Sequence, residues 1–179
     1  MKTTEILIAG FGGQGILFSG KFLAYKGLLE DLQVSWLPSY GPEMRGGTAN
    51  CNVILSDTPV GSPIITAPGV LIAMNLPSLE KYVDTVVAGG QIYVDSSLID
   101  AKVERDDVEV FYIPATQIAK DEGIGTLANM IILGNFLEKN PNMSFEGVEA
   151  VVEKLVPPKK AALKELNMKA LSLGKNYKN

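Results

Sequence analysis

The sequence has no histidine and a single cysteine, Cys51, among its 179 residues. The chain therefore cannot form an internal disulfide, and it lacks the ligands for a usual zinc site or for an iron–sulfur cluster of its own. Histidine-based acid–base catalysis is excluded as well. An enzyme acting alone would depend on carboxylates, lysines, hydroxyls or Cys51, and the sequence shows no recognisable arrangement of these. The absences favour a subunit that helps other chains do chemistry.

Strong positive charge and long apolar runs are also missing. The formal net charge is −4, and no basic patch with interleaved aromatic residues occurs, so we expect no nucleic-acid partner. No apolar run reaches the roughly 18 residues that span a bilayer, and the first residues lack the apolar core and cleavage site of a signal peptide. We therefore predict a cytoplasmic protein with no membrane partner. The length favours a single domain over residues 1–179.

Glycine is concentrated after a short apolar run near the N-terminus. Glu5–Ala9 is typical of a buried parallel strand, and Gly10, Gly12 and Gly15 have the G-x-G-x-x-G spacing of a dinucleotide-binding turn. The helix predicted to follow directs its unpaired N–H groups and the positive end of its dipole at the space above the turn. The candidate residues for binding an anion or another ligand are Gly10, Gly12, Gly13, Gln14 and Gly15.

Other interpretations of these glycines remain open. NAD or FAD binding needs an acidic residue at the end of the second strand, but Gln33–Leu37 runs into Pro38 without one, and Glu30 comes before the strand. Residues 15–22 approach a Walker A motif, yet Phe22 stands where Ser or Thr would hold Mg²⁺. A tight turn without a ligand is the third alternative, because glycine also permits close helix–sheet packing.

Strand-like and helix-like patterns follow one another along the chain. Strands are expected at 5–9, 33–37, 50–56, 70–75, 91–95 and 108–113, and helices at 16–29, from Pro77 onward, and at 116–122, 127–139, 144 onward and 159–175. This order predicts an α/β fold, a Rossmann-like three-layer sandwich with a mainly parallel sheet and a helical C-terminal third. Residues 1–115 would form the alternating βα core, and residues 116–179 would be mainly helical.

Four local features accompany this prediction. Pro38 should close the second strand, because proline cannot donate to a ladder. Leu28 is expected on the apolar face of the first helix, and Leu163 on the apolar face of the last. The lysines of the last helix are expected to form its solvated surface. Ser144 begins a cap-like sequence before a further helix.

The segment from Pro38 to Thr48 has neither strand nor helix periodicity. Its prolines and glycines indicate a stiff loop that carries Glu43 and Arg45 at the carboxyl end of the second strand, where open α/β sheets bind ligands. Arg45 could hold a phosphate or carboxylate through its planar guanidinium, or Glu43 and Arg45 could pair with each other or with a neighbouring subunit. The candidate residues of this interface or active-site loop are Tyr40, Gly41, Pro42, Glu43, Arg45, Gly46 and Gly47.

Cys51 alternates with apolar residues in the predicted third strand. A buried structural cysteine is the first interpretation, and a nucleophilic or redox-active thiol is the alternative.

Two motifs together resemble the γ subunit of 2-oxoacid:ferredoxin oxidoreductases. They are Gly10–Gly15 and the sequence Tyr-Gly-Pro-Glu-Met-Arg-Gly-Gly at 40–47, which leads into Cys51-Asn52-Val53 and Ser56. In that family, separate subunits or fused domains bind thiamine diphosphate and iron–sulfur clusters, decarboxylate a 2-oxo acid, pass electrons to ferredoxin and capture the acyl group on coenzyme A. The resemblance covers nearly the whole chain.

The resemblance implies a γ subunit that is inactive alone and has no metal or cofactor of its own. Its partners would be α and β subunits, with δ as a further candidate, and ferredoxin through the complex. Pyruvate, ketoisovalerate, 2-oxoglutarate and arylpyruvate enzymes would share these motifs, so the 2-oxo acid stays open. The competing functions are a stand-alone nucleotide-binding or regulatory module and an independent cysteine-dependent enzyme.

Overall fold

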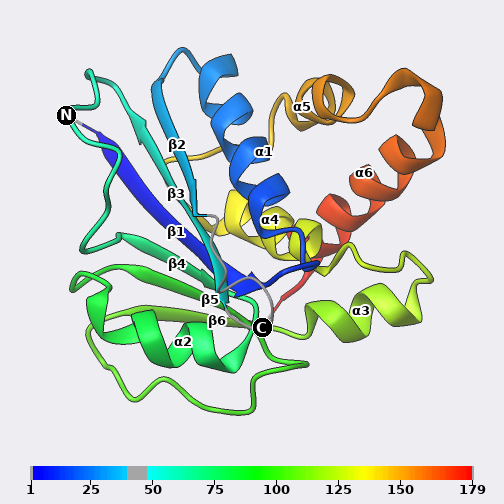
Figure 1. The fold of residues 1–179 in the computed structure, drawn as a ribbon. Coiled ribbons are helices and arrows are strands. Elements are labelled where there is room, and N and C mark those ends of the chain that lie inside the picture. The colour runs from blue at the N-terminus through cyan, green and yellow to red at the C-terminus, as the bar shows by residue number, and fades with distance from the viewer. Residues whose placement is uncertain (1, 40–47, 179) are drawn as a thin grey trace.

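A six-stranded sheet in the order β2-β3-β1-β4-β5-β6 forms the centre of the fold (Figure 1). The structure, a computed structural model, describes residues 2–39 and 48–178. The strands are β1 (Thr3–Phe11), β2 (Gln33–Ser39), β3 (Thr48–Ser56), β4 (Val70–Ala73), β5 (Gln91–Asp95) and β6 (Glu109–Ile113).

Strand β3 is the one reversed strand of this sheet. It pairs antiparallel with both β1 and β2, whereas the β1–β4, β4–β5 and β5–β6 pairs are parallel. Only residues 40–47 separate β2 from β3, and a parallel pair would need a crossover of about a dozen residues or more. The predicted α/β fold with a mainly parallel sheet is therefore confirmed, with one reversed strand next to the β2 edge.

Helices lie on both faces of the sheet, but unequally. In Figure 1, the helices α1, α4, α5 and α6 lie on one side and α2 on the other. The helices are α1 (Ile16–Leu29), α2 (Leu76–Tyr82), α3 (Ala115–Asp121), α4 (Ala128–Lys139), α5 (Val148–Leu155) and α6 (Ala161–Asn176), with 3₁₀ turns η2 (Val83–Thr85) and η3 (Pro158–Lys160). The connections at 57–69 and 96–108 contain no helix, so strands and helices alternate less regularly than predicted.

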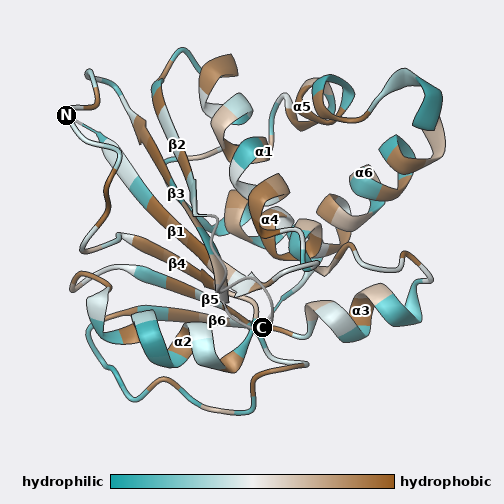
Figure 2. Ribbon diagram, viewed as in Figure 1, coloured by the Kyte–Doolittle hydropathy of each residue, from teal (hydrophilic) through white to brown (hydrophobic). Residues whose placement is uncertain are grey.

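Alternation along the strands divides the core between the two faces. On β1, Ile6 and Ile8 face the large cluster under α1, α4, α5 and α6, whereas Leu7 faces a smaller cluster with Leu79 of α2. Hydrophobic residues are concentrated along the strands in Figure 2. The central strands β4 and β5 are buried along their whole lengths, as expected for parallel strands covered on both faces.

The four local expectations need correction. Strand β2 continues through Pro38, because an edge strand has an unpaired side that tolerates a residue without an N–H. Leu28 is 55% exposed, and α1 buries Lys26 instead; Leu163 is also exposed. Helix α5 begins after Gly147 with φ 75°, and Ser144 does not cap it.

Candidate functional site

The glycine turn connects the end of β1 to the start of α1. Gly13 and Gly15 have φ values of 93° and 74°, in the left-handed region that favours glycine. Gly15 is the N-cap of α1 and provides no side-chain cap, so the first N–H groups of the helix remain available to a ligand. Gly12 lies in the exposed part of the same turn.

Gly10 has a packing role in the turn. A Cβ atom there would lie 2.6 Å from Gln14 Oε1 and 2.8 Å from Met74 Cβ, closer than real Cβ atoms approach. This glycine is buried at the end of β1, where the absence of a side chain permits the close passage of the turn beside Met74.

Gln14 fastens the turn to the neighbouring strand. Its Oε1 accepts the N–H of Phe11 at 2.6 Å, and its Nε2 donates to the carbonyl oxygen of Met74, just beyond β4, at 2.9 Å. An amide side chain is needed for this, because one end must accept and the other must donate. Gln14 therefore holds the turn at the gap between β1 and β4.

Asn129 supports the start of α1 from α4. Its Nδ2 donates to Ser19 Oγ at 3.0 Å and to the carbonyl oxygen of Gly15 at 3.3 Å, and the residue is 5% exposed. Sequence reasoning missed this residue, because nothing in the local pattern around 129 indicates a contact more than 100 positions away.

Asp95 has a comparable supporting role at the end of β5. It is fully buried, and its carboxylate accepts the hydroxyl of Thr116 at 2.6 Å and the N–H of Ser97 at 3.1 Å. These hydrogen bonds fix Thr116 at the start of α3, beside the glycine turn.

Two cavities flank the turn and share Gly13 and Thr126 in their walls. One, of about 240 Å³, lies toward α5 and α6 and includes Lys160, and the other, of about 230 Å³, lies toward Leu98 and Thr116. A ligand at the α1 N-terminus would therefore find space on either side. Open α/β sheets bind ligands at this carboxyl-end edge.

The second sequence motif is only bracketed by the structure. Tyr40, Gly41, Pro42, Glu43, Arg45, Gly46 and Gly47 lie outside the described residues. The flanking residues Ser39 and Thr48 end β2 and begin β3, and Thr48 is paired with Phe11 at the start of the glycine turn. Ser39 and Thr48 therefore both lie at the end of the sheet that carries the turn.

Cys51 is buried in β3, facing α1. It is 0% exposed, and its thiol lies 3.5 Å from the carbonyl oxygen of Ile16. Burial disfavours the thiolate and raises the pKa of Cys51 to about 12. The geometry therefore favours the structural interpretation of this residue over a nucleophilic one.

We expect Cys51 in the folded chain to resist a thiol reagent at pH 8. A rise in pKa from 9.0 to about 12 lowers the thiolate fraction roughly a thousandfold. Thiol counting with and without denaturant checks this, with one reactive thiol expected only after unfolding. Fast stoichiometric labelling of the native chain would contradict the burial of Cys51.

Within residues 2–39 and 48–178, no cluster of three or more Cys, Asp or Glu side chains is placed to hold a metal ion. No helix in the same ranges is both long and apolar enough to cross a membrane.

Comparisons with known proteins place this architecture in one family. The family model of pyruvate ferredoxin/flavodoxin oxidoreductase matches residues 5–177. The chain is 41% identical over 133 residues to ketoisovalerate oxidoreductase subunit VorA of Methanothermobacter marburgensis, covering 74% of this chain but only 28% of VorA. It is 35% identical over 178 residues to 2-oxoglutarate synthase subunit KorC of the same organism, covering 96% of this chain and 94% of KorC.

Solved structures agree with the sequence relatives. The γ subunit of a keto/oxoacid ferredoxin oxidoreductase from Geobacter sulfurreducens has a TM-score of 0.80 at 30% identity and is covered over 95% of its length, with 96% of this chain included. A 2-oxoglutarate:ferredoxin oxidoreductase from Magnetococcus marinus, with 2-oxoglutarate, coenzyme A and succinyl-CoA bound, has a TM-score of 0.86 at 26% identity. There the match takes in 98% of this chain and 31% of the longer one. The chain therefore belongs to the pyruvate ferredoxin/flavodoxin oxidoreductase family and corresponds to its γ subunit.

Proposed function

We propose that this chain is the γ subunit of a 2-oxoacid:ferredoxin oxidoreductase that oxidatively decarboxylates a 2-oxo acid to an acyl-CoA in the cytoplasm. Thiamine diphosphate and iron–sulfur clusters would be held by α and β subunits, with δ as a further candidate, and electrons would leave to ferredoxin. The observation that carries this assignment is the uncapped glycine turn, set between two cavities in a chain of this family.

The carboxyl-end edge also has the composition of a subunit contact. Phe11 ends β1, and Leu76 and Leu98 come shortly after the ends of β4 and β5; these residues are 42%, 36% and 48% exposed. Apolar residues gathered beside polar ones on a surface mark protein contacts. In the Magnetococcus protein the corresponding region is part of a chain about three times as long. We infer that this edge faces the thiamine-binding partner.

Coenzyme A is the ligand that best fits the turn. Its phosphates are anions, and the free N–H groups at the start of α1 together with Lys160 provide donors and positive charge beside the two cavities. The cofactor would supply the thiol that accepts the acyl group. This chain would bind and orient its phosphate end.

The residues on either side of the loop motif lie at the same end of the sheet. We propose that Glu43 and Arg45 contact the partner subunit or an anionic group of the ligand, with Tyr40, Gly41, Pro42, Gly46 and Gly47 shaping the loop. The support is that Thr48 pairs with Phe11 beside the glycine turn and that Ser39 lies at the same end of the sheet.

Reconstitution tests this function. The chain is combined with its cognate α and β subunits, and 2-oxo-acid-dependent, coenzyme-A-dependent dye reduction is measured with and without it. We expect no turnover from the chain alone and full turnover only from the complete set. Full activity without this chain, or tight adenine-nucleotide binding by the isolated chain with no effect on the complex, would favour a stand-alone module instead.

Gln14→Glu should weaken coenzyme A binding in the reconstituted enzyme. The added carboxylate faces the Met74 carbonyl and places a negative charge at the anion site. Repulsion between this carboxylate and a phosphate charge about 4 Å away would cost about 1 to 4 kcal/mol of binding free energy. The KM for coenzyme A should therefore rise roughly tenfold or more. Gln33→Glu, at the exposed start of β2, is the matched control. Equal KM values for both variants would remove Gln14 from the site.

A further inference from the structure

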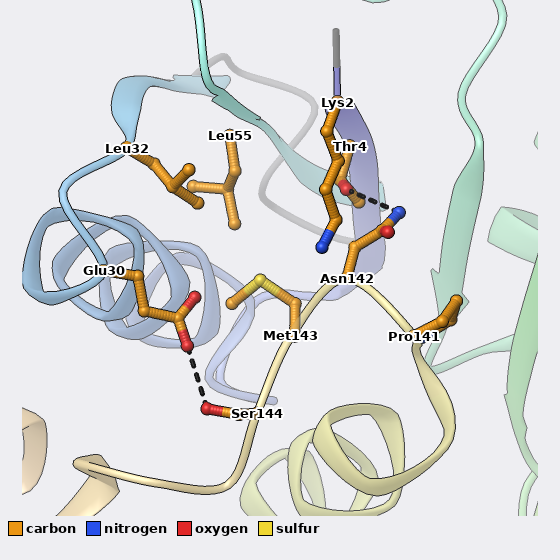
Figure 3. Close-up of a pocket in the computed structure, with 9 residues that line it drawn as sticks. All are labelled: Lys2, Thr4, Glu30, Leu32, Leu55, Pro141, Asn142, Met143 and Ser144. Carbon is orange, nitrogen blue, oxygen red and sulfur yellow. Dashed lines mark hydrogen bonds between the residues drawn. The ribbon is translucent and has the colours of Figure 1, made fainter.

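A cavity of about 330 Å³ lies at the amino-end edge of the sheet, far from the glycine turn. It is enclosed by the start of β1, the end of α1 and the segment after α4, and its walls include Lys2, Thr4, Glu30, Leu55, Met143 and Ser144 (Figure 3). This volume is at the small end of the range of ligand pockets. It is therefore suited to a small metabolite and too small for a dinucleotide.

Charged side chains of both signs lie around this cavity. Glu30 is neutralised from behind by Lys26, whose side chain is 1% exposed, and its Oε1 also accepts the Ser144 hydroxyl at 3.0 Å. The ammonium group of Lys2 has no ion-pair or hydrogen-bond partner within the described ranges, and its side chain extends toward the cavity in Figure 3. The Lys2 ammonium group is therefore the positive charge that faces the cavity from β1, and the Asp57 carboxylate accepts the backbone N–H of the same residue at 2.8 Å.

Thr4 adds a hydrogen-bond donor to the same wall. Lys2 and Thr4 are two positions apart in an extended chain, so their side chains point to the same side. Thr4 is 7% exposed, and its oxygen accepts Asn142 Nδ2 at 3.3 Å, which leaves the hydroxyl proton free to be donated. An ammonium group beside a hydroxyl is suited to a carboxylate.

Another part of the cavity wall is apolar, next to the polar side chains of Glu30, Asn142 and Ser144. Leu32, Leu55 and Met143 supply its hydrophobic surface, and Leu55 and Met143 are 2% and 7% exposed. We propose that this cavity binds a small aliphatic carboxylate, with the carboxylate at Lys2 and Thr4 and a short branched chain against these three side chains.

This site is separate from the one at the glycine turn. Lys2 and Thr4 lie at the beginning of β1, and the turn follows Phe11 at its end. Nine residues of strand span about 27 Å at the usual rise. A ligand of this size cannot touch both sites.

Binding is tested on the full chain by NMR with 3-methylbutanoate as the probe. We expect saturable shifts of the backbone amides of Thr4, Leu32 and Met143 at millimolar probe, with those of Gly13 and Gly15 unchanged. Two matched probes separate the parts of the interaction. 3-Methylbutanamide keeps the chain but lacks the charge, acetate keeps the charge but lacks the chain, and each should bind at least tenfold more weakly.

Variants locate the charge that matters. Lys2→Gln should weaken 3-methylbutanoate binding at least tenfold, whereas Lys21→Gln, on the exposed side of α1, should leave it unchanged. Absence of saturable shifts, or equal binding by both variants, would overturn the site. Shifts confined to Gly13 and Gly15 would place the carboxylate at the glycine turn, which contradicts this inference but not the proposed function.

Discussion

Replacing Gly174 with alanine is expected to lower the free energy of unfolding by about 3 kcal/mol or more. Gly174 of α6 packs directly on the backbone of Ile131 in α4, and Gly134 of α4 packs on the backbone of Leu171 in the same reciprocal way. A Cβ at Gly174 would overlap the Ile131 carbonyl group and lie 2.9 Å from the backbone nitrogen of Asn135. Backbone atoms cannot swing aside, so the two helices would have to separate.

The separation would also break a polar contact between the helices. Asn135 is 2% exposed, and its Nδ2 donates to the carbonyl oxygens of Gly174 at 3.1 Å and Tyr177 at 3.3 Å. Leaving a buried amide unpaired costs about 1 to 3 kcal/mol. In a helix, alanine by itself is favoured over glycine by about 1 kcal/mol, so any loss of stability must come from the contacts between α4 and α6.

Thermal and urea unfolding of Gly174→Ala measure this effect. Ser172→Ala, on the exposed side of the same helix, is the control and should change stability by only a few tenths of a kcal/mol. If Gly174→Ala is as stable as the wild-type chain, α4 and α6 are not packed backbone to backbone. The helical third would then be held by side chains alone.

The strands and helices that local sequence specifies were predictable. The buried run at 91–95 and the helix from 16 to 29 have the predicted boundaries, because apolar content and periodicity are properties of the segment itself. The reversal of β3 was not predicted, because the direction of a strand depends on its partners. The exposure of Leu28 and burial of Lys26 were missed for a similar reason, since Glu30 and Ser144 create the environment of that lysine.

The candidate site also combines a part that the local sequence predicts with a part that depends on tertiary contacts. The glycine spacing located the turn, and Gly13 and Gly15 do adopt the left-handed conformations that glycine permits. The supports of the turn could not be found from the sequence, because Asn129 and Met74 contact it from other elements. Motifs identify a turn, whereas its rigidity comes from tertiary contacts.

Gly15→Ala should reveal how far the turn depends on one of those contacts. At a φ of 74°, an alanine pays about 1 to 2 kcal/mol in backbone strain. Its Cβ would also lie 2.5 Å from Asn129 Nδ2 and 2.9 Å from Asn129 Cγ, so the buried amide would have to move away from Ser19. Loss of these hydrogen bonds adds about 1 to 3 kcal/mol, and we expect a total near 3 kcal/mol.

Gly13→Ala is the matched comparison. Gly13 has a φ of 93°, but no atom lies within 4 Å of the position its Cβ would take, so this variant should show the backbone strain alone. The difference between the two variants measures the Asn129 contact, and it should shrink when both are made in an Asn129→Ala background, because contacting residues are not additive. Equal unfolding free energies for Gly15→Ala and Gly13→Ala in the wild-type background would mean that Asn129 does not support the start of α1. The anion site would then depend on the glycine turn and Gln14 alone.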